Sequence, residues 1–137
     1  MAHFSRSFTL RTQDHHQVVD VTSEVREILR ASAVREGQLT IYTPHATAAV
    51  TINENDDPNI GVDFLRALSQ LVKEHDGWLH DRVDNNAAAH IKSAMIGPSE
   101  TIPIIDGQLS LGTWQNVFFV EFDGPRRERR VIVSIVS

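Results

Sequence analysis

The spacing of apolar residues predicts strands and helices in succession through the first half of the chain. Apolar and polar residues alternate weakly over residues 3–12 and again over 18–21, on either side of a polar turn, which indicates an opening β-hairpin. Helical spacing follows from Thr22 or Ser23 and stops at Gly37. Two further strands are then expected, and they are separated by a break at Pro44-His45-Ala46. They cover residues 39–43 and 47–53.

The second half of the chain predicts two helices followed by a run of strands. Asp57-Pro58 is typical of a helix start, and an apolar stripe follows over residues 64–72. A second apolar face covers residues 87–95, and strand patterns then continue to the end without another helix. The expected strands are 101–105, 108–111, 116–122 and 131–136. This order predicts an α+β fold, with mixed or antiparallel sheets that form a sandwich with two to three helices.

The composition changes this picture in four respects. With 137 residues, the chain has the size of one domain, 1–137. No apolar run approaches the ~20 residues of a membrane span, and the N-terminus lacks a secretory pattern, so a cytoplasmic location without membrane association is expected. A formal net charge of -5 disfavours a general nucleic-acid surface. Because the chain has no cysteine, any metal must be bound by nitrogen and oxygen.

Histidines and carboxylates at breaks between the expected elements are the main candidates for chemistry. His45, His80 and His90 each lie at a break or a helix start, and three imidazoles with a water can form a catalytic zinc site. Their spacing matches no short local zinc motif, so caps and loop hydrogen bonds explain them equally well. Glu54 follows a strand and suits a general acid or base. The pair His15-His16 is expected to face solvent in its turn.

Two further segments suit the binding of a phosphorylated ring. In Leu111–Asn116, an indole and two amides suit stacking on a planar polar ring, although a glycine bulge packed by a core tryptophan also explains them. Four arginines in residues 126–130 suit phosphate oxygens, although a solvated hairpin end explains them as well.

Five short segments, taken together, are distinctive in their order. They are His45-Ala46-Thr47-Ala48, Asn53-Glu54-Asn55 with Asp57-Pro58, His80-Asp81, His90-Ile91-Lys92-Ser93 and Leu111-Gly112-Thr113-Trp114-Gln115. With these segments the chain resembles the YjbQ-like family, which is named for secondary thiamine-phosphate synthase activity. The resemblance covers nearly the whole sequence.

The resemblance implies a trimeric α+β fold with a histidine-lined pocket that can hold a divalent metal, either zinc or, with a diphosphate substrate, magnesium. It also implies a weak transferase activity that joins hydroxymethylpyrimidine diphosphate to thiazole phosphate and releases pyrophosphate. The expected partners are therefore a homotrimer and a small phosphorylated metabolite. Asp56 departs from the small or thiol residue expected at its position, which argues against a nucleophile beside Glu54.

The resemblance and the residue types together give a predicted site. Its metal ligands are His80, His90 and His45, its catalytic residues are Glu54, His45 and Gln115, and its substrate contacts are Asn55, Trp114, Arg126 and Arg130. Two other functions fit the same residues. One is a metal-dependent phosphoester hydrolase, and the other is a trimeric metabolite-binding protein without catalysis.

Overall fold

The computed structural model describes residues 2–137, which form two antiparallel sheets, three α-helices and one short 3₁₀ helix. The strands are β1 (His3–Thr12), β2 (Gln17–Asp20), β3 (Gly37–Tyr42), β4 (Ala48–Asn53), β5 (Ser99–Ile105), β6 (Gln108–Leu109), β7 (Asn116–Glu121) and β8 (Arg126–Val136). The helices are α1 (Thr22–Ser32), α2 (Asn59–Leu71), the 3₁₀ helix η1 (Leu79–Arg82) and α3 (Ala87–Ile96). The predicted α+β class with antiparallel sheets is confirmed.

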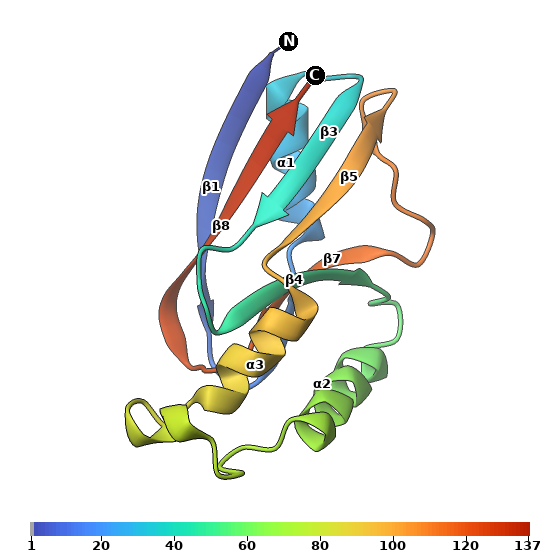
Figure 1. Ribbon diagram of the computed structural model, residues 1–137. Helices are drawn as coiled ribbons and strands as arrows, with labels where there is room; N and C mark the ends of the chain where they lie inside the picture. The colour runs from blue at the N-terminus through green and yellow to red at the C-terminus, as the bar shows by residue number, and fades with distance from the viewer. Residues whose placement is uncertain (1) are drawn as a thin grey trace.

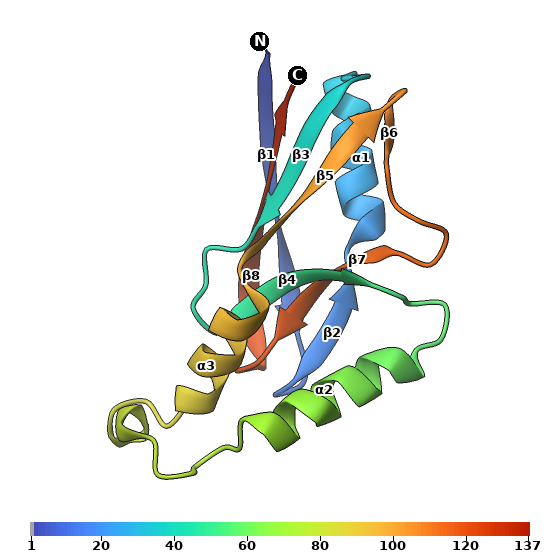
Figure 2. The same ribbon diagram turned by 45° about the vertical axis from the view of Figure 1, so that its right-hand side comes forward.

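The strands divide between a larger and a smaller sheet. One sheet has the order β1-β8-β3-β5-β6 and the other the order β2-β7-β4. In Figures 1 and 2 the smaller sheet lies between the larger sheet and the helices α2 and α3, while α1 lies alongside the larger sheet. Within residues 2–137, no helix has the length and apolar character needed to cross a membrane.

The smaller sheet separates two apolar clusters because its side chains alternate between its faces. Val117 and Phe119 of β7 belong to the main core, with residues of α1 and the larger sheet. Phe118 and Val120, one position along, pack with α2 and α3 on the other face. This alternation holds α2 and α3 against the sheet, and α3 carries the candidate residue His90.

Three departures from the predicted elements concern segments near the candidate residues. The last strand begins at Arg126 rather than at residue 131, so the arginine-rich segment lies within β8. The expected loop before α3 contains η1. Helix α2 begins at Asn59, one residue after Pro58, although the carboxylate of Asp57 still accepts a hydrogen bond from the backbone N–H of Asn59 at 3.0 Å.

Candidate functional site

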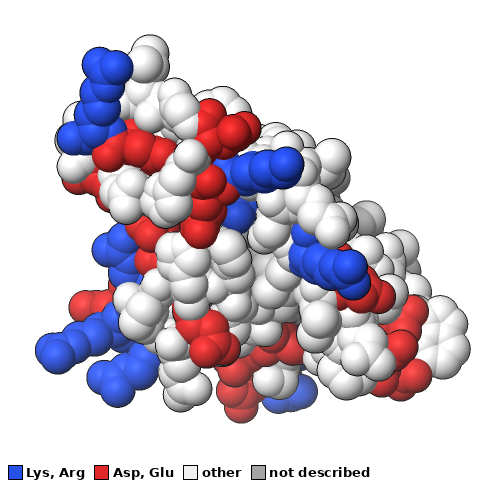
Figure 3. Space-filling model, turned by 90° about the horizontal axis from the view of Figure 1, so that it is seen from below, with Lys and Arg blue, Asp and Glu red and all other residues white. Residues whose placement is uncertain are grey.

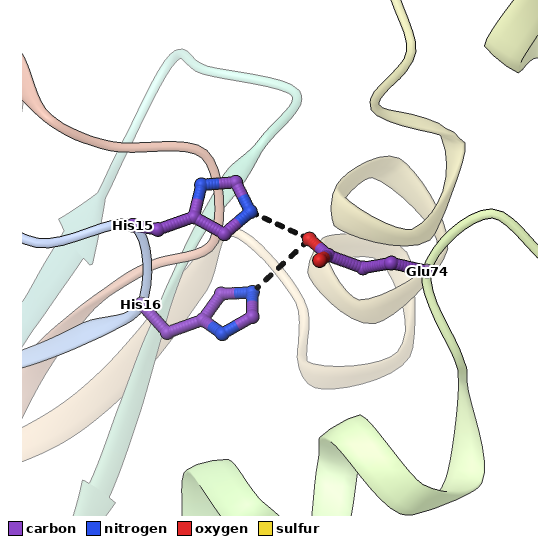
Figure 4. A group of neighbouring side chains, drawn as sticks. All are labelled: His15, His16 and Glu74. Carbon is purple, nitrogen blue, oxygen red and sulfur yellow. Dashed lines mark hydrogen bonds and ion pairs between the residues drawn. The ribbon is translucent and has the colours of Figure 1, made fainter.

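The strongest group of metal-ligating side chains in the described chain is His15, His16 and Glu74. The two histidines lie in the turn between β1 and β2, and Glu74 follows the C-terminus of α2. One ligand atom from each residue lies within 4.8 Å of the other two, and no other such group of three occurs in residues 2–137. Figure 4 shows both imidazoles directed at the carboxylate of Glu74. The loop and the helix end thus converge from segments far apart in sequence.

Hydrogen bonds outside this group fix the orientation of both imidazoles. Nδ1 of His15 lies 3.2 Å from the carbonyl oxygen of Gly124, which can only accept, so Nδ1 is the donor. Nε2 of His16 lies 3.1 Å from Nζ of Lys92, and a lysine ammonium can only donate. When His15 is neutral, the lone pair of its Nε2 therefore faces Glu74, and the hydrogen bond of its Nδ1 to Gly124 is the kind of outer bond that orients a metal-binding histidine. The lone pair of His16 Nε2 instead accepts from Lys92, so a metal at this nitrogen must displace the ammonium.

The electrostatics of the group differ between its two histidines. Burial lowers the pKa of His15, but its hydrogen bonds with Glu74 and Gly124 outweigh burial and leave that pKa above its usual value. Burial and the charges of Lys92 and His15 lower the pKa of His16. Nε2 of His15 is 2.5 Å from Glu74 Oε1, while Nε2 of His16 is 3.6 Å from the same oxygen. His15 and Glu74 thus form an ion pair, and His16 stays neutral beside it.

Lys92 is the buried cation behind this group. Its residue is 1% exposed on α3, and its ammonium lies 5.5 Å from the centroid of the Phe122 ring. Burial lowers its pKa. Its hydrogen bond to His16 therefore connects the β1–β2 turn to the interior of the α3 packing.

The three histidines predicted from the sequence lie in a different region. His45 and His90 line one hollow of about 510 Å³ with Tyr42, Ser93 and Pro98. The rings of His80 and His90 meet edge to face, with centroids 4.8 Å apart. The structure thus brings His80 to His90 and His90 to His45, but it does not gather three ligand atoms from this set within 4.8 Å.

The hydrogen bond of His45 constrains the role of its ring. Nε2 accepts from the backbone N–H of Arg130 at 2.9 Å, so the neutral ring carries its proton on Nδ1. Burial and the nearby charge of Arg129 lower the pKa of His45, which favours this neutral form. In this position Nδ1–H is a hydrogen-bond donor toward a ligand. Metal binding by His45, which stays a prediction, requires a different arrangement of the ring.

Four other predicted residues lie at the end of β4 opposite His45. Asn53 of β4 pairs with Asn116 of β7, so Glu54 and Asn55 lie at the same end of the smaller sheet as Trp114 and Gln115. His45 precedes β4. The six residues of β4 separate its two ends by about 17 Å. The single chain therefore divides the predicted site into two halves.

Two of the four side chains in this second half already have partners. Asn55 Nδ2 donates to Asp20 at 2.9 Å, and Gln115 Oε1 accepts from the backbone N–H of Gly112 at 2.9 Å. Trp114 is 58% exposed, so it is not a core tryptophan. The two arginines do not belong to this half: the backbone of Arg130 is hydrogen-bonded to His45 and its side chain is exposed, while Arg126 pairs with Asp123 at 2.9 Å. The predicted roles of all these residues stay predictions.

Comparison with known proteins establishes the family. The model of the family described as UPF0047 protein YjbQ-like matches residues 6–137. The chain belongs to this family. The UPF0047 protein MJ1081 of Methanocaldococcus jannaschii is 43% identical, over 95% of this chain and 92% of that protein. YugU of Bacillus subtilis is 39% identical, over 88% and 91%.

Solved structures of this UPF0047 family have the same fold. A hypothetical protein from Aeropyrum pernix K1 superposes with a TM-score of 0.94 at 43% identity, and the match covers 98% of each chain. A YbjQ-like protein of unknown function from Sulfolobus solfataricus P2 gives a TM-score of 0.95 at 33% identity, over 98% of this chain and 96% of that chain.

The expected thiamine-phosphate synthase-like activity is wrong as a description of this family. The family and its relatives are described only as UPF0047 proteins, without an activity. In the structure, the predicted histidines and the predicted ring contacts lie at opposite ends of β4, so one chain does not assemble the site on which that activity depended.

Sequence analysis did not identify His15, His16 and Glu74 as a group. Both histidines were expected to face solvent. His15 is exposed, as expected, but His16 is partly buried. The available signal was two adjacent histidines in a short turn between strands. Glu74 follows the apolar stripe of α2 and gave no signal of its own, since only the packing of α2 places it beside the turn.

Proposed function

We propose that this UPF0047 protein binds a divalent transition metal, zinc in the first instance, through Nε2 of His15, Nε2 of His16 and a carboxylate oxygen of Glu74. The observation that carries the proposal is the convergence of these three atoms within 4.8 Å. Ligand atoms around tetrahedral zinc lie about 3.3 Å apart, and the partly exposed side chains need only small adjustments to reach this spacing. The outer hydrogen bond from Nδ1 of His15 to Gly124 supports the same conclusion, whereas Lys92 must leave Nε2 of His16 before a metal can bind there.

The donor set fits a metal with an open coordination position. Two imidazoles and one carboxylate leave room for water or substrate, as in catalytic rather than structural zinc sites. Such a metal supplies Lewis acidity and an activated water. Glu74 contributes negative charge, and the carbonyl of Gly124 retains a proton on Nδ1 of His15, so a metal would displace the Nε2 proton that now faces Glu74.

Zinc titration of metal-free protein by calorimetry tests the proposal. We expect stoichiometric binding that His16→Ala weakens at least tenfold, on the order of 1.4 kcal/mol, because a ligand is lost. Glu74→Gln should also weaken it. His3→Ala is the matched control, since that histidine is exposed and its ring is hydrogen-bonded to Ser134 at 3.0 Å, away from the proposed ligands.

Two further variants separate this site from the histidines predicted by sequence. Lys92→Met should strengthen zinc binding, because it removes the cation that now occupies the lone pair of His16. His90→Ala should leave zinc binding unchanged. Loss of zinc with His90→Ala but not with His16→Ala would instead support His80, His90 and His45 as ligands.

We also propose the homotrimer implied by the resemblance. Large apolar side chains are exposed on α2, α3 and the segment between them, and a monomer has no evident use for them. They include Val62, Leu71, Leu79, Val83 and Met95. Assembly also offers a way to bring the two halves of the predicted site together from different chains.

Sedimentation velocity tests the trimer. We expect a mass three times the 15.4 kDa of one chain, and a shift toward monomer when Leu79, which is 75% exposed, is replaced by Asp. A wild-type protein that sediments as a monomer at all concentrations would refute this proposal.

A further inference from the structure

A basic groove lies where the end of β1 meets the start of β8. It has a volume of about 400 Å³, and three arginines line it together with three uncharged residues. The lining residues are Arg11, Thr12, Gln13, Pro125, Arg126 and Arg127. No carboxylate lines it, although the chain as a whole carries a formal net charge of -5. Figure 3 shows basic side chains that project together from the left edge of the face seen from below.

A β-bulge places the arginines side by side. Leu10 pairs with Arg129 and Thr12 pairs with Arg126, so the single residue Arg11 lies opposite two residues of β8. The extra residue breaks the alternation of β8, and Arg127 is exposed while Arg129 is buried. Like charges on neighbouring strands repel each other. The bulge therefore places Arg11 close to like charges on β8.

Arg126 is fixed in place by hydrogen bonds at the rim of the groove. Its Nε donates to the carbonyl oxygen of Asp123 at 2.9 Å, and its Nη2 donates to the Asp123 carboxylate at 2.9 Å. Its backbone N–H donates to Thr12 Oγ1 at 3.0 Å. Nη1 has no such partner. Fixed guanidinium groups lose little conformational freedom when they bind an anion, which favours binding.

Arg11 and Arg127 have charge that the protein does not neutralise. Throughout residues 2–137, neither guanidinium forms an ion pair within 4.0 Å, whereas Arg126 pairs with Asp123 and Arg129 with Glu121. Glu128 lies in the same strand but does not line the groove. Two unpaired guanidinium groups beside a fixed third suit the oxygens of a phosphate group, which guanidinium binds in a bidentate manner.

We propose that this groove binds the phosphate group of a small phosphorylated ligand. None of the proposed metal ligands lines this groove, and it shares no lining residue with the hollow of His45 and His90. Free phosphate and a phosphate monoester share the chemistry that the three arginines recognise. A monoester extends beyond the arginines along Gln13 and Pro125, so it should bind more tightly than free phosphate.

Calorimetric titration of chelator-treated protein with inorganic phosphate and with phenyl phosphate, at constant ionic strength, tests the proposal. We expect saturable binding that Arg11→Gln and Arg127→Gln each weaken about tenfold, because each removes charge-assisted hydrogen bonds. The double variant should show no saturable binding. Arg66→Gln is the matched control, since Arg66 is exposed on α2 outside the groove. Both groove arginines are also exposed, so these variants should fold normally.

The proposal is overturned if the double variant binds phosphate as tightly as the wild type, if Arg66→Gln weakens binding equally, or if the wild type shows no saturation. Glu74→Gln, which should impair zinc binding, should leave phosphate binding unchanged. Failure of the zinc experiment and failure of this one are therefore distinguishable.

Discussion

Replacement of Arg129 by methionine is expected to lower the free energy of unfolding by about 3–5 kcal/mol. Arg129 is 4% exposed and forms an ion pair with Glu121, which is fully buried. Methionine retains much of the aliphatic volume but removes the charge. The Glu121 carboxylate would then remain buried without its cation, and desolvation of an unpaired charge is among the largest costs of a single substitution.

The cost is large because the network around the ion pair is fully formed. Glu121 Oε1 accepts from Arg129 Nε at 2.9 Å and from Thr12 Oγ1 at 2.7 Å, and Oε2 accepts from the backbone N–H of Asp123 at 3.0 Å. Arg129 also donates to Thr47 Oγ1 at 2.9 Å. The network joins β1, β7 and β8 to the residue before β4, so it connects the two sheets.

Urea unfolding monitored by circular dichroism measures the effect. Arg127→Met is the matched control, because Arg127 lies in the same strand but is exposed, and it should change stability by no more than about 0.5 kcal/mol. Combining Arg129→Met with Glu121→Gln should recover part of the loss, since the buried charge is then removed. Equal effects of the two arginine variants would show that the buried ion pair does not govern stability.

The same ion pair predicts the direction of acid destabilisation. Burial raises the pKa of Glu121, but hydrogen bonds from Arg129, Thr12 and Asp123 outweigh burial and leave that pKa below its usual value. A group with a lowered folded pKa binds fewer protons when folded, so its stabilisation is complete above the unfolded value of about 4.3. It is lost as the pH falls through the folded pKa. Glu121→Gln should therefore flatten the pH dependence of stability below about pH 4.3.

Local patterns predicted the helices and strands because apolar residues repeat about every 3.6 residues in a helix and every second residue in a strand. The apolar stripe before Leu71 gave α2, and the alternation of residues 131–136 gave the buried face of β8. Extended toward the N-terminus, the same alternation puts Arg129 and Arg127 on the side of Val131, and Arg129 is indeed buried. Arg127 is exposed because a bulge adds one residue opposite Arg11, and register against a partner strand is not visible within one strand's own sequence.

The candidate site was harder to predict because its members meet only through tertiary packing. The sequence motifs drew attention to His80 and His90, and their rings do meet. The same motifs grouped His45 with Trp114, although β4 holds them at opposite ends of a sheet. His15 and Glu74 are 59 residues apart, and no local pattern indicates that the end of α2 reaches the first turn.

Replacement of Gly124 by alanine is expected to lower the free energy of unfolding by about 3 kcal/mol and to impair zinc binding as well. A Cβ at this position would overlap the carbonyl oxygen of Asp14 and lie 2.9 Å from Cγ of Glu121. The first of these is backbone, so the turn before β2 must move. Two hydrogen bonds also join Gly124 to His15. The N–H of Gly124 donates to the His15 carbonyl at 3.0 Å, and Nδ1 of His15 donates to the Gly124 carbonyl.

Thermal unfolding and zinc calorimetry on the same samples separate these two effects. Gly61→Ala is the matched control, because a Cβ there makes only ordinary contacts with Val18 at 3.6 Å or more, and alanine favours a helix over glycine. That variant should be neutral or slightly stabilising and should bind zinc normally. If Gly124→Ala proves unstable but still binds zinc like the wild type, the outer hydrogen bond of His15 does not orient a metal ligand. In that case the close packing at Gly124 stabilises the fold but does not affect zinc binding. The displaced Asp14 carbonyl would have left the adjacent His15 imidazole undisturbed.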